Sequence, residues 1–354
     1  MVNPLRVLLS GPGLIGQKHA ALLNENPDTV LAGIVAPDHS ASYEFARAQG
    51  VPHYTTLETA LTLSSVDALI VSSPNSAHFE QVEGALRSGL PVLVEKPLTE
   101  TLASAAKLVK VAETQSTPVL VGHHRTYSPL LEVARQFLMS DSFGTPVAMQ
   151  GTALFYKPDD YFAAGPWRSQ RGGGPILINM IHEVGVMRHL FGEIDSITAQ
   201  VSNAIRSFEV EDSVVISLSF VNGALGTFLL SDVSASTKSW EMTAGEDPAY
   251  PFFPNQDCYH FAGTRGSLDF PSMRIVSYGK NSAPSWWEPF EERRLEAKRE
   301  DPLARQLQHF VAVARGLEIP RVSIRDGFLN MVAVEAICRA AETGQRIKLS
   351  TLIE

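Results

Sequence analysis

The chain has 354 residues and a formal net charge of −9, with 19% charged and 44% hydrophobic residues. This balance is typical of a globular protein with room for two domains, and an acidic chain without a basic block excludes a nucleic-acid partner. No apolar run approaches the ~20 residues of a membrane span, so no membrane association is expected. The two cysteines, Cys258 and Cys338, are far apart and fit neither a disulfide framework nor a metal site.

The beginning of the sequence indicates the compartment. It enters an apolar, strand-like run at once, without the basic region and long apolar core of a signal peptide. The low cysteine content is typical of a reducing environment. We therefore expect a cytoplasmic protein.

A glycine motif follows the first apolar run and precedes a helical pattern. In this context Gly11 permits a tight turn, Gly13 lets the backbone approach a pyrophosphate, and Gly16 lets helix and strand pack closely. The helix start, which contains Leu14 and Ile15, offers free N–H groups and a positive dipole end to phosphates. The sequence predicts a dinucleotide site for NAD or NADP.

The choice between the two cofactors depends on the end of the second predicted strand, 30–35. Ala36 occupies the position where an acidic residue usually binds the adenosine ribose, and the nearest acid is Asp38. No arginine marks a 2′-phosphate site. The nearby acid favours NAD slightly.

A Ser-Pro-Asn turn follows the apolar strand 66–72. Ser73, Pro74 and Asn75 lie at the same predicted sheet edge as the glycine loop and could contact the nicotinamide half of the cofactor. An equally open interpretation is a helix N-cap at Asn75 or Ser76. His78 is either a further cofactor contact or an ordinary residue of the first helical turn.

A lysine stands at the end of the next buried strand, 91–94. Glu95, Lys96 and Pro97 come where the chain must turn, and ligands bind at the carboxyl ends of strands in α/β sheets. A lysine that is partly desolvated there has a lowered pKa and can act on a substrate. The alternative is a surface lysine at a strand end. The alternation of strands and helices up to Gly122 predicts a doubly wound parallel sheet.

The ordered set of motifs resembles the Gfo/Idh/MocA family, the relatives of glucose–fructose oxidoreductase and inositol dehydrogenase. The motifs are Gly11-x-Gly13-x-x-Gly16, Ser72-Ser73-Pro74-Asn75-x-x-His78, Glu95-Lys96-Pro97, and Val121-Gly122-His123-His124-Arg125 with Pro129. The resemblance implies that Lys96 is the family's catalytic lysine, with a cis peptide bond to Pro97, and that Glu95 and Lys96 also adjoin the cofactor.

The resemblance also implies the domain organisation. A Rossmann domain, residues 1–122, is followed by an α/β domain, residues 123–354, which is built on a large, mostly antiparallel sheet. One face of that sheet carries the substrate pocket and the other is often a subunit interface. A homodimer or homotetramer through the C-terminal sheet is therefore expected.

An aromatic and charged segment, 156–168, is a candidate substrate surface. The aromatic faces of Tyr156 and Trp167 suit the apolar side of a sugar, and Arg168 suits its hydroxyls. Arg125 is a further candidate substrate contact. Ordinary anchoring of a loop by its aromatic residues is an equally open interpretation.

A Gly-Gly-Gly run, 172–174, precedes a predicted helix that contains His182. In the family such a run introduces an acid four residues before a histidine, and His182 matches that histidine as a catalytic and substrate-binding residue. Here Ile178 occupies the place of the acid, and Asn179 follows it. At i, i+3 spacing Asn179 and His182 can share a helix face, so Asn179 is a candidate substrate contact.

Period-two alternation predicts strand after strand from Asp195 onward. They span residues 195–204, 212–220, 224–232, 239–243, 258–263, 266–271 and 274–278. Asn222-Gly223 is a strong hairpin turn. The charged stretch 291–301 is expected to be a solvated face, and helices are expected at 303–315 and 326–343.

The predicted reaction is hydride transfer between nicotinamide and a secondary alcohol of a sugar, inositol or related polyol. Lys96 or His182 carries the proton, and the missing acid leaves the choice between them open. Two other functions remain. One is a redox-neutral glycosidase or lyase that oxidises a sugar transiently through bound NAD, and the other is a non-catalytic, nucleotide-sensing regulator.

Overall fold

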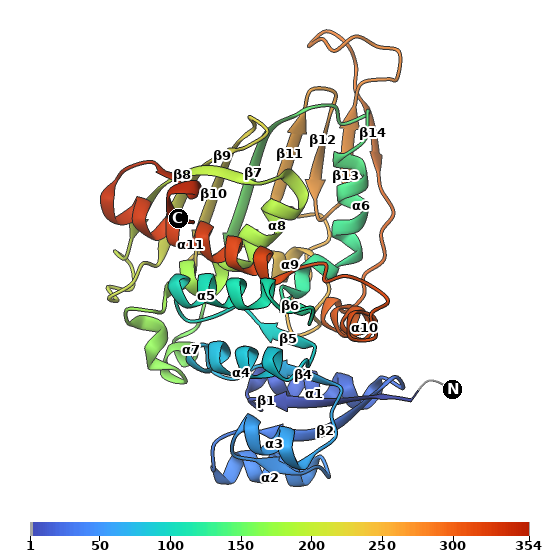
Figure 1. Ribbon diagram of the computed structural model, residues 1–354. Coiled ribbons are helices and arrows are strands. Elements are labelled where there is room, and N and C mark those ends of the chain that lie inside the picture. Colours follow the sequence, from blue (N-terminus) through green and yellow to red (C-terminus); the bar gives the residue numbers. More distant parts are fainter. Residues whose placement is uncertain (1–2, 354) are drawn as a thin grey trace. The chain divides into compact units, whose positions relative to one another are not determined.

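The computed structural model describes residues 3–353, and the chain forms two compact units (Figure 1). The N-terminal unit comprises the chain up to His124 together with Leu303–Met331. The C-terminal unit comprises Arg125–Pro302 and the chain from Val332 onward. Among the described residues, no helix has the length and apolar character needed to cross a membrane.

The N-terminal unit contains a six-stranded sheet with the order β3-β2-β1-β4-β5-β6. Its strands are β1 (Leu5–Ser10), β2 (Thr29–Val35), β3 (His53–Tyr54), β4 (Ala68–Val71), β5 (Val92–Glu95) and β6 (Val119–Gly122). All neighbouring strands are parallel. The strand order reverses between β1 and β4, which opens a crevice at their carboxyl ends. The doubly wound sheet predicted from the sequence is confirmed.

Helices connect these strands as the alternation predicted. They are α1 (Leu14–Glu25), α2 (Ser40–Ala48), α3 (Leu57–Leu63), α4 (Asn75–Arg87) and α5 (Leu102–Glu113). A capping box between Thr101 and Ser104 begins α5. Apolar residues of the strands are almost fully buried beneath the helices, as in sheets that are covered on both faces.

A late segment of the chain completes the N-terminal unit, whereas the sequence suggested an uninterrupted domain over residues 1–122. The backbone N–H of Val121 on β6 donates to the carbonyl of Val322 at 2.9 Å. Asn330 Nδ2 and His123 Nε2 are 3.0 Å apart. Helix α10 (Pro302–Ala314) and the first part of α11 (Ile324–Thr343) therefore belong largely to this unit.

The C-terminal unit contains a nine-stranded sheet with the order β14-β13-β12-β11-β7-β10-β9-β8-β15. Its strands are β7 (Pro146–Leu154), β8 (Ile194–Ser202), β9 (Ser213–Phe220), β10 (Leu225–Ser231), β11 (Tyr259–Gly263), β12 (Gly266–Phe270), β13 (Arg274–Ser277), β14 (Glu291–Arg294) and β15 (Ile347–Lys348). Only β7 and β10 pair in parallel, so the predicted, mostly antiparallel sheet is confirmed. The predicted hairpin at Asn222-Gly223 joins β9 to β10, with Gly223 at a φ of 90°.

The two faces of this sheet differ. Helices α6 (Pro129–Leu138) and α8 (Ile181–Phe191) lie on one face (Figure 1), where Tyr259, Phe261 and Phe228 are buried. On the strands of the opposite face Val215, Leu225 and Leu229 are exposed. An open face that carries branched apolar residues can accept a further layer of protein.

Two segments differ from their predicted structure. Residues 239–243 were predicted as a strand, but they form the short helix α9 (Trp240–Thr243), so that prediction is wrong. Buried Trp240 packs its ring against Phe270, and this tertiary contact outweighs the local alternation. Part of the charged stretch at 291–301 forms the edge strand β14, whose residues are exposed as expected.

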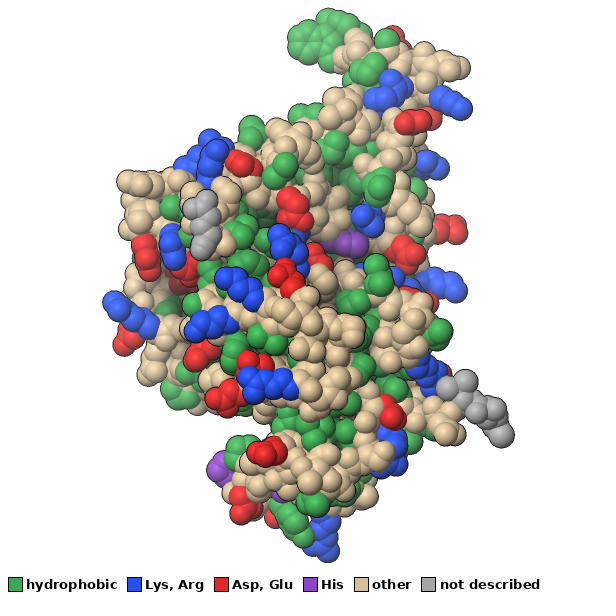
Figure 2. All heavy atoms as spheres, in the orientation of Figure 1, with side chains coloured by type: hydrophobic (Ala, Val, Ile, Leu, Met, Phe, Trp, Pro, Cys, Tyr) green, Lys and Arg blue, Asp and Glu red, His purple; other side chains and the backbone are tan. Residues whose placement is uncertain are grey.

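The connection between β13 and β14 extends beyond the sheet (Figure 1) and ends in apolar side chains, shown green in Figure 2. Trp286 and Trp287 are 86% and 83% exposed. The remaining short elements are α7 (Asp159–Ala163), the 3₁₀ turns His124–Tyr127, Pro166–Ser169 and Leu349–Leu352, and a π-helical turn at Ile176–Met180.

Candidate active site

The glycine loop adopts the close packing that its sequence predicts. Gly11 has a φ of 85°, and a Cβ atom there would lie 2.4 Å from Ser73 Cα. A Cβ atom on Gly16 would lie 2.0 Å from the carbonyl oxygen of Gly11. Both positions therefore require glycine because neighbouring backbone occupies the space of a side chain.

Gly13 has the opposite environment, since, apart from its two chain neighbours, no atom of the described residues lies within 4 Å of where its Cβ would be. It is the N-cap of α1, and no side chain caps the helix. Leu14 is 82% exposed, and Ile15 follows it in the first turn. An uncapped helix start beside open space fits a phosphate, so this loop fits the pyrophosphate of a dinucleotide.

The Ser-Pro-Asn turn is connected to the glycine loop by side-chain hydrogen bonds. Ser72 Oγ donates to the carbonyl of Gly11 at 2.8 Å, and Ser73 Oγ donates to Gln81 at 2.8 Å. Pro74 is the N-cap of α4, which starts at Asn75. These contacts hold the carboxyl ends of β1 and β4 together at the crevice.

His78 is buried, and both of its ring nitrogens contact backbone carbonyls. Nδ1 is 2.9 Å from the carbonyl oxygen of Pro97, and Nε2 is 2.9 Å from that of Ser73. Burial lowers the pKa of His78. The ring thus links the Ser-Pro-Asn turn to the loop after Lys96. Its contact with a cofactor stays a prediction.

At the end of β2, Ala36 is buried and Asp38 is exposed. The backbone N–H of Ala36 donates to the carbonyl of Tyr54 at 3.0 Å, so position 36 belongs to the sheet rather than to a loop. A carboxylate that binds the ribose must therefore come from the following turn, where Asp38 lies.

Lys96 follows β5, and its peptide bond to Pro97 is cis, as the family resemblance implied. The preceding Glu95 is buried, and its Oε1 is 2.8 Å from Nε2 of His19 on α1. Contacts with His19 keep the pKa of Glu95 below its usual range, although burial alone would raise it. A Cβ atom on Gly122 would lie 2.9 Å from the Glu95 carboxyl carbon. A buried carboxylate thus packs against the backbone at the end of β5, directly before Lys96.

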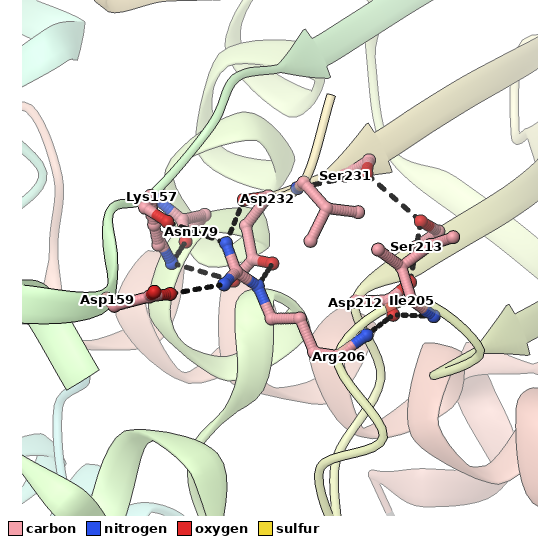
Figure 3. Close-up of polar contacts among 10 residues, drawn as sticks. Lys157, Asp159, Asn179, Ile205, Arg206, Asp212, Ser213, Ser231 and Asp232 are labelled. Carbon is pink, nitrogen blue, oxygen red and sulfur yellow. Dashed lines mark hydrogen bonds and ion pairs between the residues drawn. The ribbon is translucent and has the colours of Figure 1, made fainter. Parts of the chain in front are cut away.

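A second polar cluster lies in the C-terminal unit (Figure 3). Lys157 Nζ donates to Asn179 Oδ1 at 2.7 Å and lies 3.5 Å from Asp232 Oδ2. Arg206 Nε binds the other oxygen of Asp232 at 3.1 Å. Burial lowers the pKa of Lys157, and the carboxylate of Asp232 opposes this effect. Asn179, a predicted substrate contact, therefore belongs to a network of buried charges.

The aromatic segment carries two of the predicted substrate residues on its surface. Tyr156 is 59% exposed and Trp167 is 53% exposed. The guanidinium carbon of Arg168 lies 4.0 Å from the ring centroid of Tyr161 and 5.8 Å from that of Trp167. Stacked cations and exposed rings of this kind suit a polar ligand with an apolar face.

The helix after the Gly-Gly-Gly run contains a π-helical turn at Ile176–Met180, and His182 is half-buried in the first turn of α8. A π turn is wider than an α turn and changes which side chains share a face. The polar cluster includes Asn179 and not Ile178. The pairing of Asn179 with His182 across a helix face stays a prediction.

Arg125 lies in the interior of the C-terminal unit. Its Nη1 binds Glu183 Oε1 at 2.5 Å and its Nη2 binds Glu241 Oε1 at 2.5 Å. The hydroxyl of Tyr259 donates to the other oxygen of Glu183. Two ion pairs already engage the guanidinium, so its contact with substrate stays a prediction.

Sequence reasoning missed His19, Lys157, Asp232 and Arg206. His19 lies three residues after Gly16, but its partner Glu95 is 76 residues away. Lys157 precedes a proline in the aromatic segment, and its burial could not be read from that context. Among the described residues, no group of three or more His, Cys, Asp or Glu side chains could hold a metal ion.

Two family models match the chain. The oxidoreductase family with an NAD-binding Rossmann fold, GFO_IDH_MocA, matches residues 5–123, and the GFO/IDH/MocA C-terminal domain matches residues 131–269. The chain therefore belongs to the Gfo/Idh/MocA family of oxidoreductases, and the sequence-based assignment is confirmed.

Relatives and solved structures agree with this family. The chain is 22% identical to D-apiose dehydrogenase of Paraburkholderia graminis, over 99% of this chain and 91% of that protein. It is 29% identical to inositol 2-dehydrogenase of Corynebacterium glutamicum, over 43% and 46% of the two chains. An Agrobacterium radiobacter oxidoreductase in complex with NAD+, L-tartaric acid and magnesium shares the fold, with a TM-score of 0.82 and 18% identity over 99% and 100% of the chains.

The contrast between Gly16 and Gly13 gives a first prediction. Gly16→Ala should destabilise the protein by about 1–3 kcal/mol, because its methyl group overlaps the Gly11 carbonyl. Gly13→Ala should change stability by less than about 0.5 kcal/mol but should weaken dinucleotide binding, since the methyl group fills open space. Urea unfolding and titration of NADH fluorescence measure the two effects. Equal stability of the two variants would contradict this packing.

A pH-dependent stability follows from Glu246. Ser128 donates to its Oε1, and its buried Oε2 has no partner among the described residues. Burial raises the pKa of Glu246 to about 7, against hydrogen bonds from Ser128 and Trp240 and the charges of Arg125 and Arg299. The folded protein thus retains a proton that the unfolded chain loses near pH 4.5, so stability falls as pH rises from about 4.5 to 7.

The variant Glu246→Gln should remove this pH dependence. At 1.36 kcal/mol for each pH unit of pKa difference, the stability gained over the wild type should reach roughly 3 kcal/mol above pH 7. Urea unfolding between about pH 5 and pH 8 measures it, with Glu80→Gln on the exposed surface of α4 as the control. Parallel pH profiles of Glu246→Gln and wild type would show that the raised pKa is wrong.

Proposed function

We propose that the protein is an NAD(P)-dependent dehydrogenase that acts on a secondary alcohol of a sugar, inositol or related polyol. The observation that carries this proposal is the uncapped glycine loop at the crevice, with Lys96 at the same sheet edge. The names of the relatives, D-apiose dehydrogenase and inositol 2-dehydrogenase, support the substrate class.

The residues of the N-terminal unit would bind and orient the cofactor. The pyrophosphate would lie on the N–H groups that begin α1, over Gly13. Asp38 would bind the ribose, which favours NAD. The Agrobacterium radiobacter neighbour was crystallised with NAD+. A bound nicotinamide supplies hydride chemistry, and the protein supplies orientation and proton transfer.

Lys96 would donate a hydrogen bond to the reacting oxygen and stabilise its developing negative charge. Such a donor in a site from which water is excluded can contribute several kcal/mol to catalysis. The buried carboxylate of Glu95 would hold the backbone from which the Lys96 side chain extends, since the backbone N–H of Lys96 donates to Glu95 Oε2 at 3.3 Å. His182 would accept the hydroxyl proton in the oxidation direction, as the family resemblance implies.

The protein would act as a homodimer or homotetramer through the open face of the nine-stranded sheet. The exposed Val215, Leu225 and Leu229 give that face its apolar character. Leu229→Arg should lower the mass measured by light scattering, whereas Val221→Arg, in the turn after β9, should not. An unchanged mass of Leu229→Arg would exclude this face as the interface.

A spectrophotometric assay tests the function. The protein is mixed with NAD or NADP and with aldoses, inositols, anhydrosugars and uronic acids, and absorbance reports reduced nicotinamide. Reduction with one cofactor and one polyol class is expected. If the panel is silent, the protein is incubated with NAD and a set of glycosides, and cleavage of a glycoside with NAD unchanged would instead establish the redox-neutral reaction.

A lysine variant tests the mechanism. Lys96→Met should lower kcat by at least roughly a hundredfold while it preserves cofactor affinity, because charge stabilisation acts on the reacting oxygen. Lys110→Met, on the exposed end of α5, is the matched control and should keep full activity. Unchanged turnover of Lys96→Met would remove the lysine from the mechanism.

A further inference from the structure

The side chain of Glu95 has a hydrogen-bonding neighbour at each of its two oxygens. Oε1 is 2.8 Å from Nε2 of His19 on α1, and Oε2 accepts the backbone N–H of Lys96 at 3.3 Å. Glu95 is 6% exposed, and His19 is fully buried. A protonated carboxyl group would bring a hydrogen that needs an acceptor. Of these two neighbours, only the ring nitrogen of His19 could accept it.

The second ring nitrogen of His19 shows where the hydrogen lies. If Glu95 donated to Nε2, the hydrogen of a neutral imidazole ring would have to be on Nδ1. Nδ1 is buried and has no hydrogen-bond partner among residues 3–353, and a buried donor without an acceptor is costly. A doubly protonated ring would leave the same donor unsatisfied. The ring hydrogen is therefore on Nε2, and Glu95 is a carboxylate that accepts it.

Other titratable groups face this carboxylate from several elements. They are Lys96 itself, His124 in the turn after β6, and His78 on α4. Burial alone would raise the pKa of Glu95, but its contact with His19 and the charges of His124 and Lys96 hold the pKa below its usual range. Burial lowers the pKa of His78, whose ring nitrogens already contact two backbone carbonyls. Lys96 is thus among the cations that stabilise the ionised form of Glu95.

The electrostatic interaction between Glu95 and Lys96 acts equally on both partners. If the charge of the amine favours the ionised carboxylate, the carboxylate favours the protonated amine by the same free energy. Desolvation has the opposite effect, because it favours a neutral lysine. The carboxylate lies in a buried position where water screens charges weakly, so its effect on the neighbouring residue is large. The interaction therefore opposes the loss of a proton from Lys96.

We infer that Glu95, which His19 holds as a carboxylate, keeps Lys96 in its protonated form. Lys96 then acts in the proposed reaction as an ammonium group that donates a hydrogen bond to the reacting oxygen. An ammonium group has no lone pair, so the hydroxyl proton goes to another base, the role proposed for His182. This inference rests on the proposed function and assigns the two roles that the sequence left open. Glu95 and His19 are positioning residues, because both act through Lys96.

The protonation state of Lys96 can be measured without a substrate. The purified protein is labelled with a trace of acetic anhydride, which reacts with neutral amines, at a series of values between about pH 7 and pH 11, the range in which lysines titrate. Mass spectrometry reports the labelling of each lysine, and Lys110 on the exposed surface of α5 is the internal reference. The midpoint pH of Lys96 should equal or exceed that of Lys110, because the carboxylate offsets desolvation. A lower midpoint for Lys96 would overturn the inference.

A variant of Glu95 connects this midpoint to the carboxylate. Glu95→Gln removes the charge and keeps the shape, and it should lower the midpoint of Lys96 by roughly one pH unit or more. Glu100→Gln removes an exposed carboxylate four residues after Lys96 and is the matched control. It should leave the midpoint unchanged, since water and salt screen exposed charges. The same midpoint in wild type and Glu95→Gln would contradict the role of Glu95.

Two variants of His19 test how Glu95 is held. His19→Gln keeps an N–H donor, whereas His19→Leu leaves the buried carboxylate without it. In His19→Leu the pKa of Glu95 should rise above its ordinary value of 4.5, so this variant should lose stability relative to His19→Gln as pH rises from about 4.5 to 7. Urea unfolding at several pH values measures this difference. A difference that does not change with pH would show that His19 does not keep Glu95 ionised.

The outcomes also separate this inference from the proposed function. Nicotinamide reduction in the spectrophotometric assay, together with a midpoint of Lys96 below that of Lys110, would overturn the inference and leave the dehydrogenase intact. A high midpoint that depends on Glu95, in a protein that reduces neither NAD nor NADP with any member of the panel, would support the charge assignment and contradict the dehydrogenase.

Discussion

The N-terminal unit depends on a single buried carboxylate. Glu95 lies at the end of β5, binds His19 from α1, and packs against the backbone of Gly122 on β6. A charge in this position is stable only if its partners remain in place, because an uncompensated buried carboxylate is costly. The contact therefore connects the helix that begins at the glycine loop to the turn that carries Lys96, so one interaction holds both segments in place.

The sequence predicted correctly those segments whose conformation is determined by residues close together in the chain. The glycine loop was predictable because the local backbone at Gly11, Gly13 and Gly16 favours glycine. The hairpin at Asn222-Gly223 was predictable for the same reason. The bond between His19 and Glu95 was not predictable, since it joins residues 76 positions apart. The helix at Trp240 was missed because burial of its ring against Phe270 outweighs the alternating pattern.

In the C-terminal unit, charged groups are buried in ion pairs between residues that are distant in sequence, so no local sequence pattern predicts their burial. Arg125 is the last residue of a family motif, yet its charge is neutralised by Glu183, 58 residues later, and Glu241, 116 residues later. Lys157 and Asp232 are likewise distant in sequence. Buried ion pairs of this kind make a modest net contribution to stability, but removal of one partner is severely destabilising. Such a network tolerates few changes, and the orientation that it gives to Asn179 is correspondingly well defined.

The return of residues 303–331 to the N-terminal unit affects the order in which the chain can fold. During synthesis the strand β6 emerges long before Val322 can accept the N–H of Val121, so that edge of the parallel sheet stays uncovered until nearly the whole C-terminal unit has been made. Open strand edges are sites of mispairing. The N-terminal unit is thus not formed by one continuous stretch of sequence. A chimera that exchanges this unit between relatives must transfer two separate stretches, the chain up to His124 and Leu303–Met331.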